Sequence, residues 1–396
     1  MKNNLLILLI VLAIVFMLLS CGEKISRPEE IPFEGNLSDT TYLQLNPPWD
    51  EDHGYSFNNP GKIIVGWDTY LYVCDTDNHR ILQMDAAGTI HSTYEVDHPI
   101  GITQDELLRL IVVNGTRDIY KIDTYPGRNG NQTISYSVDS EHYDMLGDND
   151  VFTDVSEIPG YIDKAYFVSV YDTLLDQTGK VLLFLNDPDT SMVNNADTLL
   201  PPEFPVGGED PEAPDTSHNP VVEYGTGVGF ADHPNGLTAF ARSGSLFLLT
   251  TQDSSSFKTQ LLRWYTNSYY HVQFFQPALL PGGGTDLYSD TLNLIPSAAT
   301  VDESGNIYVV CKPDTAADSL ACSVYKFDPI GRLKEAWGPY ATTDTLDENY
   351  TSDTAGKMNF PRGVAYDYFG DRRTVYISDS GNNRILRFKL STDIEN

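Results

Sequence analysis

Residues 71–82 read LYVCDTDNHRIL, and near the other end of the 396-residue chain residues 375–386 read VYISDSGNNRIL. Six of the twelve positions are identical between the two copies. In each copy an apolar run ends at an Asp, turn-forming polar residues follow, and Arg-Ile-Leu begins a second apolar run, which predicts a β-hairpin. A two-stranded hairpin cannot bury its apolar faces alone, so its recurrence at opposite ends of the chain predicts a closed array of such units.

Both copies resemble the NHL repeat, in which a strand opened by Pro continues as Tyr-Val-x-Asp-x-x-Asn-x-Arg-Ile. The resemblance implies an all-β fold, namely a six-bladed β-propeller of the NHL or TolB-like type, and a role in binding. It also implies that the signature residues are structural, with Asp and Asn accepting backbone hydrogen bonds within the turn and Arg packing between blades. These residues are Asp75, Asn78, Arg80, Asp379, Asn382 and Arg384.

Six candidate blades follow one another along the chain. Pro60 precedes Tyr72 by twelve residues, and Pro296 precedes Tyr308 by the same interval. The sixth blade ends near residue 390 without an outer strand, whereas residues 40–45 alternate in the manner of a strand. We therefore predict that the N-terminal strand closes the ring as the missing strand. The Pro- and acid-rich residues 187–219 show no periodic apolar face, and we expect a loop over one face of the propeller.

The N-terminus has the features of an export signal. Residues 5–19 form an apolar run of fifteen residues after Lys2, which fits a signal peptide better than a membrane span. The following Leu-Leu-Ser-Cys resembles the bacterial lipobox, which implies cleavage before Cys21 and acylation of its thiol. We expect a signal peptide over residues 1–20, a tether over 21–38, and a propeller domain over 39–396. The protein would then be exported and lipid-anchored in the cell envelope, at the outer membrane, facing the periplasm or the surface.

The charge of the chain bears on its partners. The formal net charge is −31, from 25 basic and 56 acidic residues. Such a field repels nucleic acid and anionic lipid headgroups, so contact with a membrane is expected through the lipid anchor only. We expect a monomer that binds a protein, peptide or glycan.

Catalytic relatives of this fold offer an alternative. A peptide-amidating lyase with an NHL-like propeller holds zinc through His residues that follow the Pro opening an inner strand. The matching positions here are Ile100, Asn235, Ser297 and Arg362, none of which is His. Calcium-dependent lactonases of the gluconolactonase type carry Asn or Asp at this place, which Asn235 matches, with Asn149 as a weaker second. The expectation is no catalytic residue and no cofactor, with calcium-dependent lactonase or hydrolase activity as the alternative.

Two further groups of residues invite interpretation. His98 and His233 lie in matching Asp-His-Pro triplets, where two imidazoles could line the channel and meet a metal, although zinc would need a third ligand. Cys311 and Cys322 end and begin the middle strands of the fifth blade. Symmetric pairing of that hairpin would place them opposite each other, which predicts a disulfide in an exported protein.

Overall fold

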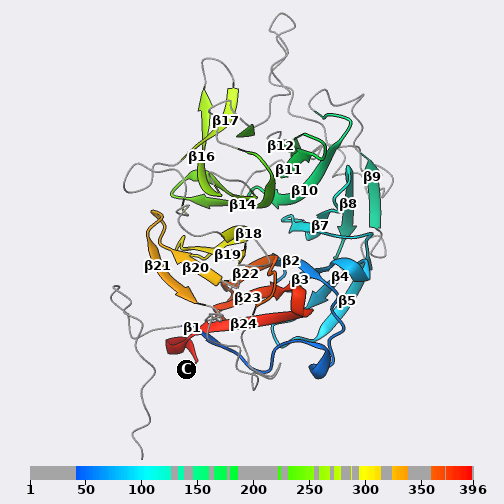
Figure 1. Ribbon diagram of the computed structural model, residues 1–396, viewed down its shortest axis with the longest axis vertical. Helices are drawn as coiled ribbons and strands as arrows, with labels where there is room; N and C mark the ends of the chain where they lie inside the picture. The colour runs from blue at the N-terminus through cyan, green and yellow to red at the C-terminus, as the bar shows by residue number, and fades with distance from the viewer. Residues whose placement is uncertain are drawn as a thin grey trace, which may run out of the picture. The chain divides into compact units, whose positions relative to one another are not determined.

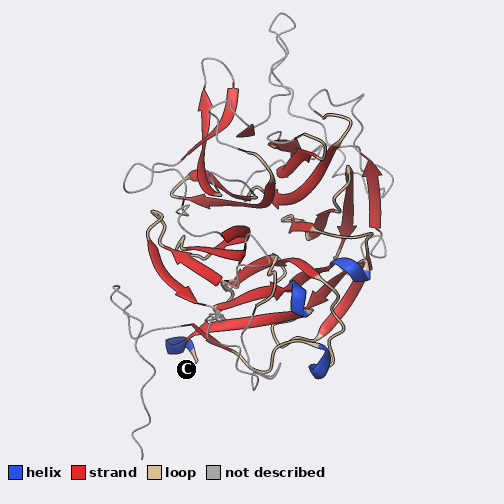
Figure 2. Cartoon of the chain, in the orientation of Figure 1, coloured by secondary structure: helices blue, strands red, loops and turns tan. Residues whose placement is uncertain are grey.

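The computed structural model describes the chain from Tyr42 to Ile394 in separate stretches. The described residues are 42–125, 133–137, 146–159, 165–175, 179–185, 222–223, 231–253, 258–267, 272–277, 287, 294–313, 323–337, 358–370 and 372–394. Strands form nearly all of the regular structure (Figure 2). Short 3-10 turns accompany them: η1 (Glu51–His53), η2 (Thr76–Asn78), η4 (Ser380–Asn382) and η5 (Ser391–Asp393).

The strands of the described residues form six antiparallel sheets of four strands each. The first sheet contains β2 (Pro60–Val65), β3 (Leu71–Asp75), β4 (Arg80–Met84) and β5 (Ile90–Glu95). The second contains β6 (Gly101–Gln104), β7 (Arg109–Val113), β8 (Asp118–Asp123) and β9 (Thr133–Ser137). The third contains β10 (Asp150–Glu157), β11 (Ala165–Asp172), β12 (Lys180–Leu185) and β13 (Val222–Glu223).

The remaining sheets follow the same order along the chain. The fourth contains β14 (Pro234–Arg242), β15 (Ser245–Gln252), β16 (Thr259–Asn267) and β17 (Val272–Pro277). The fifth contains β18 (Leu294–Val301), β19 (Ile307–Pro313), β20 (Ser323–Phe327) and β21 (Leu333–Trp337). The sixth contains β22 (Gly363–Asp367), β23 (Thr374–Asp379), β24 (Arg384–Leu390) and, from the other end of the chain, β1 (Tyr42–Gln44).

The sheets are joined into a ring. Strand β1 pairs antiparallel with β24, Tyr42 opposite Leu390 and Gln44 opposite Phe388, so the predicted closure by an N-terminal strand is confirmed (Figure 1). The first strands of neighbouring sheets contact one another in the cycle β2, β6, β10, β14, β18, β22 and back to β2. This arrangement is the predicted β-propeller.

The hydrophobic core lies between the sheets. Each of the six clusters of buried apolar residues combines side chains from two sheets that are neighbours in the ring. Close approach of the inner strands depends on glycine: a Cβ on Gly363 would lie 2.5 Å from the carbonyl oxygen of Gly61. The apolar faces that one sheet cannot bury alone are therefore covered by its two neighbours.

One expected register is wrong. Symmetric pairing of β19 and β20 would have placed Cys322 opposite Cys311, but the residue opposite Cys311 is Ser323. Cys322 lies outside the described residues, as do Cys21, the predicted signal peptide and tether, and residues 187–219. Among the residues that are described, no helix has the length and hydropathy to span a membrane.

Candidate functional site

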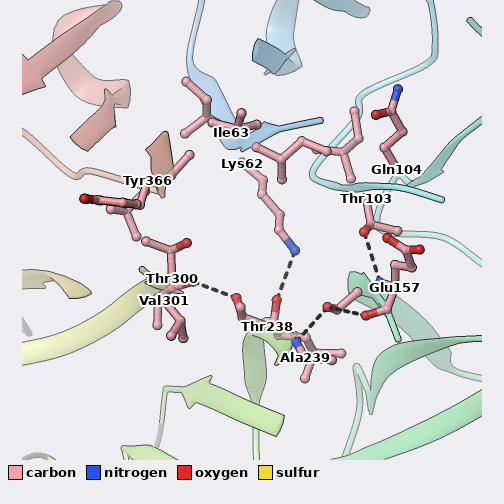
Figure 3. A pocket seen from close by; sticks show the side chains of 18 of the residues that line it. Lys62, Ile63, Thr103, Gln104, Glu157, Thr238, Ala239, Thr300, Val301 and Tyr366 are labelled. Carbon is pink, nitrogen blue, oxygen red and sulfur yellow. Dashed lines mark hydrogen bonds between the residues drawn. The ribbon is translucent and has the colours of Figure 1, made fainter. Parts of the chain in front are cut away.

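A cavity of about 210 Å³ lies on the axis of the ring and is lined by the inner strands of all six sheets (Figure 3). Its lining comes from the middle and C-terminal parts of these strands and from residues that follow three of them, Trp67, Pro159 and Tyr368. One residue from each strand illustrates this: Val65, Gln104, Glu157, Ala239, Val301 and Tyr366. A smaller cavity of about 30 Å³ is lined by residues within the inner strands and by Ile100 and Arg362, which precede β6 and β22.

Lys62 from β2 is one of the residues that line both cavities. Its ammonium donates to both carboxylate oxygens of Asp154, at 2.7 and 2.8 Å. It also donates to the carbonyl oxygens of Val155 and Leu237, at 2.8 and 3.2 Å. Lys62 therefore joins the first, third and fourth sheets across the axis. Figure 3 shows its side chain reaching from β2 toward Thr238 and Ala239 of β14.

Asp154 is the buried partner of this ion pair, with a side chain that is 4% exposed. It also accepts hydrogen bonds from the backbone N–H groups of Leu237 and Val155, at 2.7 and 2.8 Å. Burial raises the pKa of the Asp154 carboxyl, while Lys62 and the two N–H groups oppose that rise. The contacts satisfy a charge that would otherwise be costly to hold in the interior.

Glu157 ends β10 at the wall of the larger cavity. Its carboxylate oxygen Oε2 accepts a hydrogen bond of 2.7 Å from the indole N–H of Trp67, and its backbone N–H donates to Thr103 Oγ1 at 3.0 Å. Burial is the main cause that raises the pKa of Glu157 from 4.5 to about 8, and the charges of Asp105 and Glu106 add to it. At neutral pH the carboxyl is therefore mostly protonated, so that it can donate as well as accept a hydrogen bond.

Trp67 is an exposed aromatic residue whose position is fixed. It follows β2 and is 42% exposed. Its backbone N–H donates to Gln104 Oε1 at 2.7 Å, and its indole N–H is held by Glu157. The preceding Gly66 leaves room for this arrangement, because a Cβ there would collide with Gln104, Asp68 and Tyr72. The indole is thus held in place before any ligand arrives, which lowers the entropic cost of binding.

Two tyrosines complete the aromatic part of the lining. Tyr366 from β22 is 9% exposed and stacks on Tyr308, with ring centroids 5.5 Å apart. Tyr368, two residues further on, is 43% exposed and stacks on Phe369 at 4.3 Å. Burial, with the charges of Asp367 and Glu157, raises the pKa of the Tyr368 phenol.

Of the residues predicted to line the channel, Asn235 lines the smaller cavity, together with the three other positions that match the lyase's zinc ligands. Ile100, Asn235, Ser297 and Arg362 all line the smaller cavity. Asn235 is engaged by its neighbours: its amide Nδ2 donates to the carbonyl oxygen of Pro296 at 3.0 Å, and its Oδ1 accepts from Thr251 Oγ1 at 2.7 Å. Asn149 is exposed and lines neither cavity.

The two histidines also have local partners. His98 Nδ1 lies 3.7 Å from Asp77 Oδ1, and His233 Nδ1 lies 3.3 Å from Asp232 Oδ1. Neither histidine lines the larger or the smaller cavity. Among the described residues, no group of three or more His, Cys, Asp or Glu side chains has an arrangement that could hold a metal ion.

The signature residues of the two end copies make matching bonds. Oδ2 of Asp75 accepts from Asn78 Nδ2 at 2.8 Å and from Arg80 Nε at 2.7 Å. The corresponding bonds of Asp379 have the same lengths, with Asn382 and Arg384 as the donors. Oδ1 of Asp75 and of Asp379 accepts a backbone N–H from the segment before the inner strand, from Asn58 and Asn359 respectively. The Asn side chains donate to the Asp carboxylates, and the backbone bonds from Asn58 and Asn359 tie each hairpin to the segment that precedes its sheet.

The residues that build the larger cavity were not identified from the sequence. Lys62 lies in a strand that reads PGKIIV, where a single Lys suggests a solvent-facing position. Glu157 ends its strand, which also suggests exposure. One sequence feature does indicate this end of the ring. An aromatic residue follows the inner strand in two sheets, at Trp67 and at Tyr368.

Comparison with known proteins places the fold. No family model and no curated protein matches the chain. Among solved structures, a luciferin-regenerating enzyme matches 88% of this chain and 95% of its own, with 12% identity and a TM-score of 0.51. The PQQ-bound aldose sugar dehydrogenase from Streptomyces coelicolor matches 89% of this chain and 98% of its own, with 14% identity and a TM-score of 0.50.

The Cps50 (Swd1) β-propeller domain from Myceliophteria thermophila matches 84% of both chains, with 8% identity and a TM-score of 0.42. At these identities the likeness concerns the fold alone. The protein is a β-propeller whose function has to be argued from its own residues.

Proposed function

We propose that the protein is a lipid-anchored β-propeller of the cell envelope, built from NHL-type repeats, that binds a protein, peptide or glycan through its axial cavity. In this proposal Cys21 carries the lipid, and the acidic propeller acts as an interaction module rather than as an enzyme. The N-terminal sequence supports the anchor, and Cys21→Ser should release the protein from the membrane fraction. If that variant stays membrane-bound, the anchor is not at Cys21.

One observation carries the binding role. The axial cavity combines an indole held in place at Trp67 with hydrogen-bonding groups from several sheets, which is the composition of a ligand site rather than of a packed core. The alternative use of the axis, to hold calcium for hydrolysis, has less support. Both polar atoms of the Asn235 amide are already bonded, and the Lys62 ammonium occupies the oxygen-lined centre. Calcium-dependent thermal stabilisation that is lost in Asn235→Ala would favour that alternative.

A matched pair of variants tests the binding role. Trp67→Ala removes the exposed aromatic face from the cavity, whereas Tyr125→Ala removes a similarly exposed aromatic residue, 47% exposed, that does not line it. We expect Trp67→Ala to reduce at least tenfold the affinity for material captured from envelope extract, since a well-packed aromatic anchor contributes about 2 kcal/mol or more. Tyr125→Ala should bind as the wild type does. Equal binding by all three proteins would contradict the proposal.

A further inference from the structure

We infer that the ligand of the axial cavity is an uncharged sugar unit, bound against Trp67 and by the hydroxyl and carboxyl groups around it. This inference rests on the proposed function and names the ligand class for the same site. It follows from the charge balance of the cavity, from the shape of its aromatic wall, and from the hydrogen-bonding roles that its polar groups still offer.

The cavity has little net charge in a chain whose net charge is −31. Of the residues that line it, only Lys62 carries an ammonium group and only Glu157 a carboxyl group. The Lys62 charge is matched by Asp154, and its three N–H groups face four oxygen acceptors, so none is left over for an anion. A charged ligand would lose its hydration here without gaining a counter-ion, which costs binding free energy. A neutral ligand needs no counter-ion.

The polar groups of the wall offer both donors and acceptors. The Thr238 hydroxyl donates to the carbonyl oxygen of Ala299 at 2.7 Å, which leaves its lone pairs to accept from a ligand. The Thr103 hydroxyl accepts from the Glu157 backbone N–H, which leaves its proton for donation. The protonated Glu157 carboxyl can do both. Sugar hydroxyls need such a mixture because each of them both donates and accepts.

The aromatic wall and the size of the cavity favour a single ring. The exposed indole of Trp67 and the exposed ring of Tyr368 present flat apolar faces, against which the C–H face of a sugar ring can pack. The volume of about 210 Å³ is below the ~300–1,000 Å³ of sites for drug-sized ligands, so one ring fits better than a peptide segment. A sugar unit at the end of a glycan chain meets all three conditions.

Calorimetric titration of the full-length protein in a non-glycosidic detergent tests this inference. The probes are glucose, galactose and N-acetylglucosamine, with glucuronate and glucosamine as anionic and cationic counterparts. We expect at least one neutral sugar to bind, its charged counterparts to bind at least tenfold more weakly, and Trp67→Ala to abolish binding while Tyr125→Ala retains it.

A pH series adds a readout that a structural role alone would not change. Glu157 faces Trp67 after β2, Asp105 and Glu106 between β6 and β7, and Tyr368 after β22. Wild-type affinity should fall as the pH rises through about 8 and the carboxyl loses its proton, and Glu157→Gln should bind without this fall. Tighter binding of glucuronate or glucosamine than of the neutral sugars would overturn the inference.

The failure of the inference and that of the proposed function are distinguishable. If no sugar binds, but Trp67→Ala fails to capture the material that the wild type captures from envelope extract, the sugar class is wrong and the binding role stands. If Trp67→Ala captures that material as well as the wild type does, the cavity is not the binding site and both proposals fail.

Discussion

At the scale of the residue, the carboxyl of Glu157 is the most strongly perturbed acid of the cavity wall. Its pKa in the folded protein is raised to about 8, above the 4.5 of a solvated Glu, chiefly because of burial. Between these values the folded state holds a proton that the unfolded state has lost, so this group makes stability fall as the pH rises. The stabilisation that Glu157 contributes is complete below about pH 4.5 and is lost as the pH rises through about 8.

Glu157→Gln tests this linkage, because the amide cannot ionise. We expect the free energy of unfolding of the wild type to decline more steeply between about pH 4.5 and 8 than that of the variant, with the two curves approaching each other at the acid end. Denaturant unfolding at a series of pH values measures both slopes. Parallel curves would mean that Glu157 is ionised at neutral pH in the folded protein.

At the scale of the element, β1 is short but contributes a large side chain to the joint of the ring. Tyr42 is 6% exposed, stacks on Trp337 with ring centroids 4.1 Å apart, and shares a hydrogen bond of 2.8 Å with the Tyr308 hydroxyl. Both partners belong to the fifth sheet, whereas β1 pairs with the sixth. A single residue thus connects the edge strand of the last sheet to its neighbour.

Tyr42→Ala should therefore destabilise the protein by about 3–5 kcal/mol, the usual cost of removing a buried aromatic side chain. Leu43→Ala changes the next residue of the same strand, which is 45% exposed, and should cost about 0.5 kcal/mol or less. Chemical denaturation of the two variants and the wild type compares them directly. Similar losses would show that the strand pairing, rather than the Tyr42 side chain, carries the stability of the closure.

The elements were more predictable than the site, for a physical reason. Hairpins are local in sequence, so apolar runs and turn residues sufficed to predict the sheets, and the sixth blade's missing strand pointed to β1. The pairing of Cys311 with Ser323, where Cys322 was predicted, shows the limit of such predictions. The geometry of the loop decides between two registers that differ by one residue. The cavity draws Lys62, Glu157 and their neighbours from six separate strands, and no local pattern reports which of them meet on the axis.

At the scale of the whole molecule, the ion pair of Lys62 and Asp154 connects sheets that are not neighbours. Lys62 belongs to the first sheet and Asp154 to the third, and the Leu237 carbonyl of the fourth shares the same ammonium. The side chains are 15% and 4% exposed. Breaking a buried pair leaves one charge without its partner. Removing one member should therefore cost more stability than replacing both members with neutral residues.

Lys62→Met keeps the length of the side chain and removes its charge, and we expect it to cost about 3–5 kcal/mol at neutral pH. Adding Asp154→Asn should recover part of that loss, since no charge remains and the amide oxygen can still accept one of the two backbone N–H groups, of Leu237 or of Val155. Burial already raises the pKa of Asp154, so the single variant should also regain stability as the pH falls and this carboxyl takes up a proton. Denaturant unfolding of the wild type, both single variants and the double variant closes the cycle. Additive losses would show that the ammonium and the carboxylate do not depend on each other, and that the ring does not need a charge pair at its centre.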